Sequence, residues 1–231
     1  MEDKLNAESD ILEGGVQAIM LAEDSFKFYS TYLPELYKII LFQNSEFIKD
    51  AYNEQQQINR KRSRPKILLA TNFTDAVDTY NKYKNNLLGV ITDVGMIVHE
   101  GDKPEDEKED AGVEICKLVK SQTPWMPLIM QSSQVEYAEV AESLGAGFIS
   151  KGSKTLLSEL KNVILKEFGF GEFVVRDLRS NLVLARARDL MEMQTVLSTV
   201  PEPELEYHLS QMHLSKWLYA RGLFPLAKVI R

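Results

Sequence analysis

The chain has 231 residues and a formal net charge of −7 at pH 7, with 27 lysines and arginines against 34 aspartates and glutamates. This acidic balance disfavours sequence-independent binding to nucleic acid, which needs a basic face to neutralise phosphates. A single cysteine, Cys116, excludes an internal disulfide framework and a multi-cysteine zinc site. The sequence has neither an apolar run of about 20 residues that would span a bilayer nor the basic-then-apolar order of a signal peptide. We therefore expect a cytoplasmic protein with no nucleic-acid or membrane partner.

The chain opens with a polar segment and one short apolar run. Residues 1–15 are mostly polar and end in a glycine pair, so we expect a lead-in or linker there. Residues 16–22 are mostly apolar, which is typical of a strand buried on both faces, and the run stops at Glu23 and Asp24. We therefore expect a first strand with two carboxylates at its carboxyl end.

A long segment separates this strand from the next apolar run. Apolar residues recur at helical spacing from about Phe26, and Pro34 predicts a kink because proline removes an intrahelical donor. Helical character is expected to resume over residues 47–52 and to fade into the basic stretch 60–64. We interpret the segment as a lengthened helix followed by a solvated basic loop. The alternative is a homodimer or partner surface built from four residues, Phe42, Phe47, Ile48 and Tyr52.

From residue 66 onward, short apolar runs alternate with amphipathic segments. The further expected strands are 66–70, 87–92, 127–130 and 147–150, and the expected helices are 74–83, 113–120, 137–144 and 155–168. Five strand–helix units in succession predict a parallel sheet with helices on both faces and right-handed crossovers. We therefore expect residues 16–168 to form one α/β domain.

Residues 169–231 differ in pattern and predict a mostly helical extension. We expect a brief strand at 173–175, a helix at 189–197 and a longer helix at 204–218. This extension is either the start of a further module or a dimer contact. The chain ends within an apolar-periodic stretch without a helix stop signal, which favours a piece of a longer polypeptide. No basic recognition helix stands out, so we expect no DNA-binding output.

Two histidines in the extension, His208 and His213, lie five residues apart in the longer expected helix. Residues at that spacing do not share a helix face as residues four apart do. We therefore interpret them as capping or surface residues. A metal site and a phosphotransfer histidine are the alternatives.

Reactive side chains follow the expected strands. In open α/β sheets, ligands bind at the carboxyl ends of the strands, and those ends carry Glu23, Asp24, Asp93, Ser132 and Lys151. Polar residues are common at strand ends, where the chain turns to water, but all five together indicate a site. Three carboxylates repel one another unless a hard cation neutralises them, and Mg²⁺ prefers oxygen ligands. A carboxylate beside Mg²⁺ can attack phosphorus while an ammonium and a hydroxyl stabilise the phosphoryl oxygens.

Four segments that carry these residues resemble the receiver domains of two-component response regulators, the CheY-like superfamily, over about residues 17–168. The segments are 18–25, 89–96, 127–133 and 145–151. The resemblance implies a flavodoxin-like, doubly wound sheet of five parallel strands in the order 2-1-3-4-5. It also implies a signalling protein that catalyses only its own phosphotransfer and dephosphorylation.

The resemblance implies roles for the acidic residues. Asp93 would accept a phosphoryl group from the phosphohistidine of a sensor histidine kinase or a histidine phosphotransfer protein. Glu23, Asp24 and Asp93, with the backbone carbonyl of Gly95, would hold Mg²⁺.

The resemblance also implies how the phosphoryl group is held and read. Ser132 would donate a hydrogen bond to a phosphoryl oxygen, and Lys151 would pair with the phosphoryl group. Phe148 occupies the position of an aromatic residue whose rotamer reports phosphorylation. The expected switch is an equilibrium between two states that new contacts bias.

The sequence departs from the family pattern in three places. The connection at 25–64 is much longer than one short helix, and Ile97 with an acidic loop at 100–110 replaces the usual proline after the acceptor strand. Gly152 replaces the proline that often follows the lysine. We interpret the acidic loop as a solvated insertion, and electrostatic slowing of kinase access is the alternative.

Two other functions compete with a phosphoacceptor receiver. One is a degenerate receiver that acts only as a protein-interaction module, although such a scaffold has no need for clustered carboxylates. The other is a Mg²⁺-dependent phosphohydrolase with an aspartate nucleophile. Such enzymes need a second aspartate two positions later as general acid, and here that position is Gly95.

Overall fold

The computed structural model describes residues 2–49, 51 and 53–231. The chain divides into two compact units, the first formed by Met1–Phe42 with Arg64–Val163 and the second by Gln43–Ser63 with Ile164–Arg231. Tyr52, part of the expected partner surface, lies outside the described residues. In the part of the chain that is described, no helix is long and apolar enough to cross a membrane.

The first unit is built on a parallel sheet. Its strands are β1 (Ala18–Ala22), β2 (Lys66–Ala70), β3 (Leu87–Asp93), β4 (Leu128–Ser132) and β5 (Gly147–Ser150). They lie in the order β2-β1-β3-β4-β5, and all four pairings are parallel. Every residue of β1 and β3 is buried, as expected for strands covered on both faces. The expected flavodoxin-like sheet is therefore confirmed.

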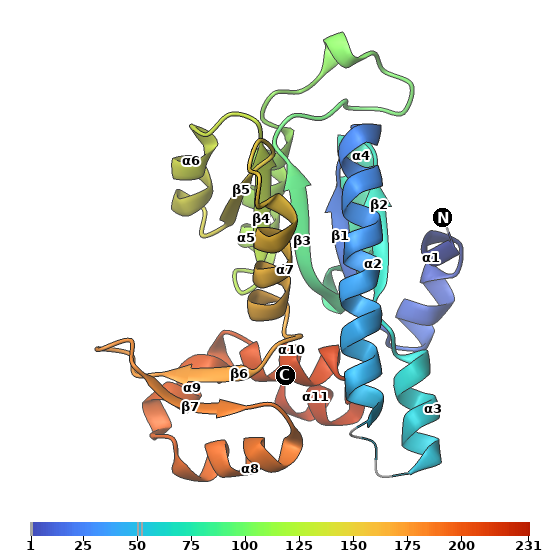
Figure 1. Ribbon diagram of the computed structural model, residues 1–231. Helices are drawn as coiled ribbons and strands as arrows, with labels where there is room; N and C mark the ends of the chain where they lie inside the picture. The colour runs from blue at the N-terminus through green and yellow to red at the C-terminus, as the bar shows by residue number, and fades with distance from the viewer. Residues whose placement is uncertain (1, 50, 52) are drawn as a thin grey trace. The chain divides into compact units, whose positions relative to one another are not determined.

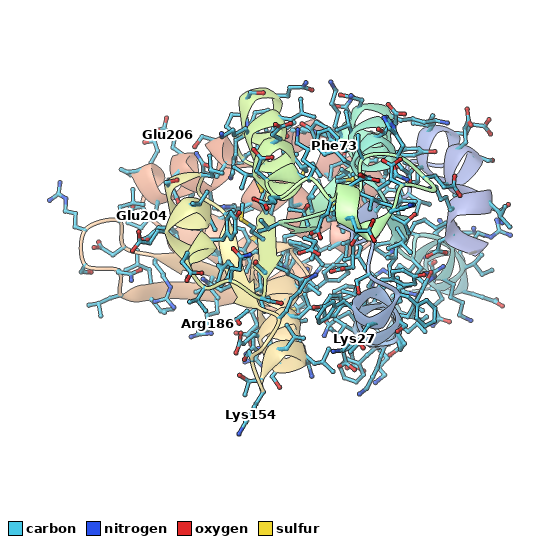
Figure 2. All side chains as sticks on the ribbon, turned by 90° about the horizontal axis from the view of Figure 1, so that it is seen from above. Lys27, Phe73, Lys154, Arg186, Glu204 and Glu206 are labelled. Carbon is cyan, nitrogen blue, oxygen red and sulfur yellow. The ribbon has the colours of Figure 1, made fainter. Side chains whose placement is uncertain are left out.

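Helices cover both faces of this sheet. They are α2 (Phe26–Lys49), α4 (Phe73–Tyr83), α5 (Ala111–Gln122), α6 (Tyr137–Ser143) and α7 (Leu156–Glu167), with 3₁₀ turns at Lys84–Asn86 and Pro104–Asp106. Figure 1 shows α2 and α7 in front of the sheet and α4 and α5 behind it. The view from above agrees, because Lys27 and Lys154 lie on one side and Phe73 on the other (Figure 2). The carboxyl ends of the strands thus form an edge between two helical layers.

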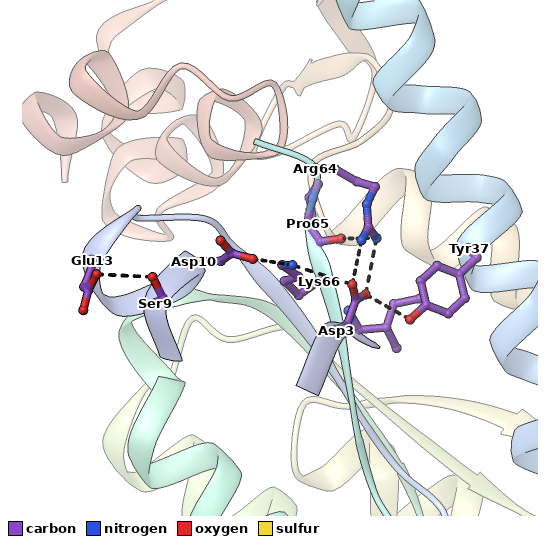
Figure 3. A network of polar contacts seen from close by, with 9 residues as sticks. Asp3, Ser9, Asp10, Glu13, Tyr37, Arg64, Pro65 and Lys66 are labelled. Atoms are coloured by element: carbon purple, nitrogen blue, oxygen red, sulfur yellow. Dashed lines mark hydrogen bonds and ion pairs between the residues drawn. The ribbon is translucent and has the colours of Figure 1, made fainter. Parts of the chain in front are cut away.

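The expected lead-in is a packed part of the first unit. It contains α1 (Glu2–Leu5) and a π-helix (Glu8–Glu13). Asp3 accepts hydrogen bonds from Arg64 at 2.6 Å and from the Tyr37 hydroxyl at 3.0 Å (Figure 3). Burial alone would raise the pKa of Asp3, but these donors and the Ile67 amide hold the pKa below its ordinary value. A buried ion pair therefore holds this segment in place. An ion pair produces no hydrophobic periodicity, so the sequence pattern did not predict this packing.

The long connection after β1 is more regular than expected. The helix α2 continues through Pro34 to Lys49, and α3 (Glu54–Arg62) takes up most of the stretch expected as a solvated basic loop. That expectation is wrong because Arg60 is buried and donates a hydrogen bond to the Phe47 carbonyl. The guanidinium of Arg221 lies 4.5 Å from the centroid of the Phe47 ring. Phe47 is therefore buried within its own unit and does not form a free partner surface, whereas Phe42 is exposed.

Besides α3, the second unit contains a β-hairpin and four further helices. The elements of its C-terminal part are β6 (Phe173–Arg176), β7 (Val183–Ala187), α8 (Leu190–Thr199), α9 (Glu202–Ser210), α10 (His213–Ala220) and α11 (Phe224–Ile230). The mostly helical character agrees with expectation, but the antiparallel partner strand β7 was not anticipated. Asp189 caps α8, because its side chain accepts a hydrogen bond from the Glu192 amide at 2.8 Å.

The two histidines lie on separate helices, which corrects the expectation of one helix over 204–218. The chain turns at Met212, whose backbone is left-handed with φ 56°. This turn brings the Nδ1 atoms of His208 and His213 to 2.9 Å. Both side chains are therefore partly buried against each other and are not surface caps.

Candidate functional site

Three carboxylates meet at the carboxyl edge of the sheet. Glu23 and Asp24 directly follow β1, and Asp93 is the last residue of the neighbouring strand β3. One carboxylate oxygen from each of the three residues lies within 4.8 Å of the other two. Glu23 is fully buried and Asp93 nearly so. Parallel pairing of β1 with β3 therefore places like charges together where little water screens them.

Lys151 joins this cluster from the end of β5. Its ammonium lies 2.7 Å from Oε2 of Glu23 and also forms an ion pair with Asp93. The lysine side chain is only 5% exposed. The ammonium also lies 4.2 Å from the centroid of the Phe28 ring, a cation–π contact supplied by α2. One cation thus holds two carboxylates from different strands.

Burial dominates the electrostatics of the cluster. The pKa of Glu23 is raised to about 8, first by burial and then by the Asp93 carboxylate, against the opposing effect of Lys151. Burial also raises the pKa of Asp93, against the effect of Lys151. A single ammonium therefore compensates this group of carboxylates only in part, and a further cation would stabilise their ionised forms.

Backbone amides fix the orientation of each carboxylate. Asp93 Oδ1 accepts a hydrogen bond from the Val94 amide at 2.8 Å, and Asp24 Oδ2 accepts one from the Ile97 amide at 2.9 Å. Oε1 of Glu23 accepts one from the Ser25 amide at 3.1 Å. The carboxylate oxygens that accept no backbone hydrogen bond are the ones available to a cation or to phosphorus.

The donor set fits Mg²⁺. Carboxylate oxygens are hard ligands, and Mg²⁺ is commonly bound through one or two carboxylates together with water. The three acidic residues expected as ligands are therefore close enough together to share one ion. The carbonyl of Gly95 stays a prediction as a further ligand.

The other expected site residues lie at neighbouring strand ends. Ser132 is buried at the end of β4, and its hydroxyl accepts a hydrogen bond from the Gln134 amide at 3.0 Å. The Ser132 carbonyl accepts one from the Lys151 amide at 2.9 Å, which ties the two strand ends together. Phe148 is half-buried, pairs with Met130 in the sheet and packs against the core. The roles of Ser132 and Lys151 in binding a phosphoryl group, and of Phe148 in reporting phosphorylation, stay predictions.

Glu107 is a residue near the site that sequence reasoning missed. Its loop is pinned by an antiparallel bridge between Met96 and Lys108, with hydrogen bonds of 3.2 and 2.9 Å. A Cβ at Gly95 would lie 1.8 Å from Oε1 of Glu107, so this side chain rests against the glycine. Burial raises the pKa of Glu107, and the carboxylates of Asp24 and Asp93 raise it further. Most of the loop is exposed, as expected for a solvated insertion, and the bridge between Met96 and Lys108 holds its Glu107 near the site.

A second missed residue, Gly112, sets how closely α5 approaches the acceptor strand. A Cβ there would lie 2.0 Å from the Asp93 carbonyl oxygen. The Gly112 amide donates to the Val94 carbonyl at 2.8 Å. Glycine is required because the backbones of the helix and the strand end are in direct contact.

Comparison with known proteins finds receiver domains among solved structures. A response regulator receiver domain protein from Clostridium thermocellum is 18% identical and matches 66% of this chain and 94% of its own, with a TM-score of 0.42. The signal receiver domain of a DNA-binding response regulator protein (merR) from Colwellia psychrerythraea 34H is 19% identical, with 65% and 98% covered and a TM-score of 0.43. The receiver domain of NtrX from Brucella abortus is 18% identical, with 65% and 97% covered and a TM-score of 0.39.

No protein-family model matches the chain, and no curated protein matches it. Because these sequence identities are below 20%, the chemistry of the site is inferred from the residues of this chain alone.

Proposed function

We propose that the first unit is a phosphoacceptor receiver domain of a two-component phosphorelay. In this proposal Asp93 takes a phosphoryl group from a phosphohistidine of a sensor histidine kinase or histidine phosphotransfer protein. The supporting observation is the cluster of Glu23, Asp24 and Asp93 at one sheet edge, with Lys151 bridging two of the three. The protein would catalyse only its own phosphotransfer and dephosphorylation.

The transfer proceeds by attack of an Asp93 carboxylate oxygen on phosphorus. An O–P bond forms to give an acyl phosphate, and the N–P bond of the donor breaks. The donor imidazole leaves with the bonding electron pair and takes a proton from water. The Val94 amide, which donates to Oδ1, holds the carboxylate in position while Oδ2 faces Lys151.

Charge on the phosphoryl oxygens is offset by groups already at the site. Lys151 would exchange its present carboxylate partners for a phosphoryl oxygen, and the Ser132 hydroxyl would donate a hydrogen bond to another. Glu23, Asp24 and Asp93 would hold Mg²⁺, whose chemistry when bound is neutralisation of charge between the carboxylates and the phosphoryl group. The change of partner at Lys151 would then bias the conformational switch.

Beryllofluoride, which mimics a phosphoryl group on aspartate, tests this proposal. Calorimetry in the presence of Mg²⁺ should detect binding to the wild type and none to Asp93→Asn. Asp78→Asn is a matched control, because Asp78 is an exposed carboxylate on α4. Equal binding by wild type and Asp93→Asn would contradict the proposal. Binding by neither would instead favour a degenerate receiver that serves as an interaction module.

A further inference from the structure

His208 and His213 form a close pair in the second unit. The Nδ1 atoms of their rings lie 2.9 Å apart, which is the length of an N–H···N hydrogen bond. Such a bond requires one of the two Nδ1 atoms to be an unprotonated acceptor. Burial agrees with this, because it lowers the pKa of both histidines. The pair therefore presents neutral imidazole, which is the form that binds metal ions.

The distance between the two nitrogens also fits neighbouring positions around one metal ion. Imidazole nitrogen binds a divalent ion at about 2.0–2.1 Å, so two such nitrogens lie about 2.9 Å apart at a right angle and about 3.3 Å apart at a tetrahedral angle. The observed distance of 2.9 Å matches the right angle, which is the geometry of Cu²⁺ and Ni²⁺ sites. The rings need only rotate so that both nitrogens face the same point.

A cavity beside the pair has room for the ion and its remaining ligands. His208 and His213 both line this cavity of about 690 Å³ in the second unit. Among the residues that the structure describes, no third histidine, cysteine or carboxylate lies close enough to the pair to complete a set of three ligands. Water or a small ligand in the cavity would therefore take the other coordination positions.

The charges around the cavity decide which kind of ion fits. Its lining carries three cationic and three carboxylate side chains, which are Lys166, Arg176, Lys216, Glu167, Glu172 and Asp177. The lining therefore adds no net charge, and Lys216 disfavours positive charge at His213. Affinity must come from the imidazole lone pairs, which favours copper and nickel over Mg²⁺ or Ca²⁺.

The backbone is strained at the turn that brings the histidines together. Met212 is left-handed with φ 56°, a conformation that is costly for a residue with a side chain. This cost is similar to the gain from one neutral hydrogen bond, so the contact between the two rings offsets the strain at best. Strain of this kind is found preferentially at binding and active sites.

Aromatic side chains keep the two imidazoles side by side. The centroid of the Tyr207 ring lies 5.4 Å from that of His208 and 5.8 Å from that of His213. The Phe173 ring lies 5.0 Å from His208 on the same measure. Ligands that are already packed together lose little freedom when they bind an ion.

We propose that His208 and His213 bind one Cu²⁺ or Ni²⁺ ion through their Nδ1 atoms at the wall of this cavity. In the metal-free protein the two rings are hydrogen-bonded to each other. On binding, the proton of the donor ring moves from Nδ1 to Nε2 through water, so both Nδ1 lone pairs reach the ion and no proton is lost overall. The site shares no residue with the carboxylate cluster of the first unit and does not depend on the proposed function.

Calorimetric titration of the full chain with Ni²⁺ is the first test, with excess Mg²⁺ present to compete for the carboxylate cluster. The wild type should bind Ni²⁺, and His208→Asn and His213→Asn should each bind at least about tenfold more weakly. His99→Asn is the control, because His99 is the one other histidine of the chain, and it should match the wild type. No binding by the wild type, or wild-type affinity in either pair variant, would overturn the proposal.

Pulsed electron paramagnetic resonance of bound Cu²⁺ keeps the test decisive if a substitution in the pair unfolds the second unit. The protein for this measurement is His99→Asn, in which His208 and His213 are the only histidines. We expect coupling of the copper to two imidazole rings, because each ring has a remote nitrogen that the method detects. Coupling to one ring or to none would overturn the proposal.

Discussion

The ammonium of Lys151 lies 2.7 Å from the buried carboxylate of Glu23. The same ammonium pairs with Asp93, so one side chain compensates carboxylates from β1 and β3. A phosphoryl group on Asp93 would compete for this ammonium. The resting contacts of Lys151 are therefore the part of the site that must change on phosphorylation.

Replacing Lys151 tests this compensation. Lys151→Met leaves buried carboxylates without their cation and should lower the free energy of unfolding by about 3 kcal/mol in a chelating buffer. Mg²⁺ should stabilise this variant more than it stabilises the wild type, because the ion replaces the lost charge. Urea unfolding with and without Mg²⁺ measures both effects. Lys154→Met, at an exposed position nearby, is the control and should match the wild type.

Asp24 provides the test of the ligand set. Asp24→Asn keeps the size of the side chain and an acceptor for the Ile97 amide but removes one negative charge. Calorimetry should find Mg²⁺ affinity reduced by about tenfold or more, because Mg²⁺ binds carboxylates far better than amides. Asp78→Asn should leave the affinity unchanged. Wild-type Mg²⁺ affinity in Asp24→Asn would show that Asp24 is not one of the Mg²⁺ ligands.

Glu107 should influence the same ion from the acidic loop. Its carboxylate is destabilised by Asp24 and Asp93, so Glu107→Gln should stabilise the metal-free protein slightly. The same change removes negative charge near the ion and should weaken Mg²⁺ binding a few-fold, with a smaller effect at high salt. Glu105→Gln, at another exposed position in the same loop, should do neither. If the two variants behave alike, Glu107 has no particular relation to the site.

The second unit should lose stability on acidification through His213. The pKa of His213 is lowered to about 4, mainly by burial and to a smaller extent by His208 and Lys216. Between that value and the ordinary pKa of about 6.5, the unfolded chain binds more protons than the folded one. Stability is therefore present above pH 6.5 and lost as the pH falls towards 4, by about 2–3 kcal/mol.

Two measurements check this prediction. An NMR titration of the histidine rings should give His213 a pKa well below that of an exposed histidine. Urea unfolding should be less pH-dependent in His213→Asn than in the wild type between pH 7 and 4. An ordinary pKa for His213, or an identical pH dependence in the variant, would show that burial does not control this group.

The sheet was predictable because buried parallel strands are short apolar runs whose ends carry polar residues. That signal located Glu23, Asp24, Asp93 and Lys151, and parallel pairing of β1 with β3 explains why they meet. The helix α3 was not predicted because its sequence is polar. Its Arg60 is buried through a contact with Phe47 that no local sequence pattern reveals. The left-handed turn at Met212 was equally hidden, since left-handed backbone is usually marked by glycine or asparagine.

The missed residues of the site share one property. Glu107 and Gly112 come close to the site through tertiary folding, from a loop and from α5, and neither directly follows a strand. The sequence around Gly112 indicates a helix but not that the glycine lies against the end of β3. Only the packing of α5 on the sheet supplies that information.

Phosphorylation of Asp93 is the central claim, and intact mass spectrometry tests it most directly. After incubation with acetyl phosphate and Mg²⁺, the wild type should gain the mass of one phosphoryl group and Asp93→Asn should gain none. The gain should disappear when Mg²⁺ is chelated. No gain in the wild type, or an equal gain in Asp93→Asn, would contradict the account.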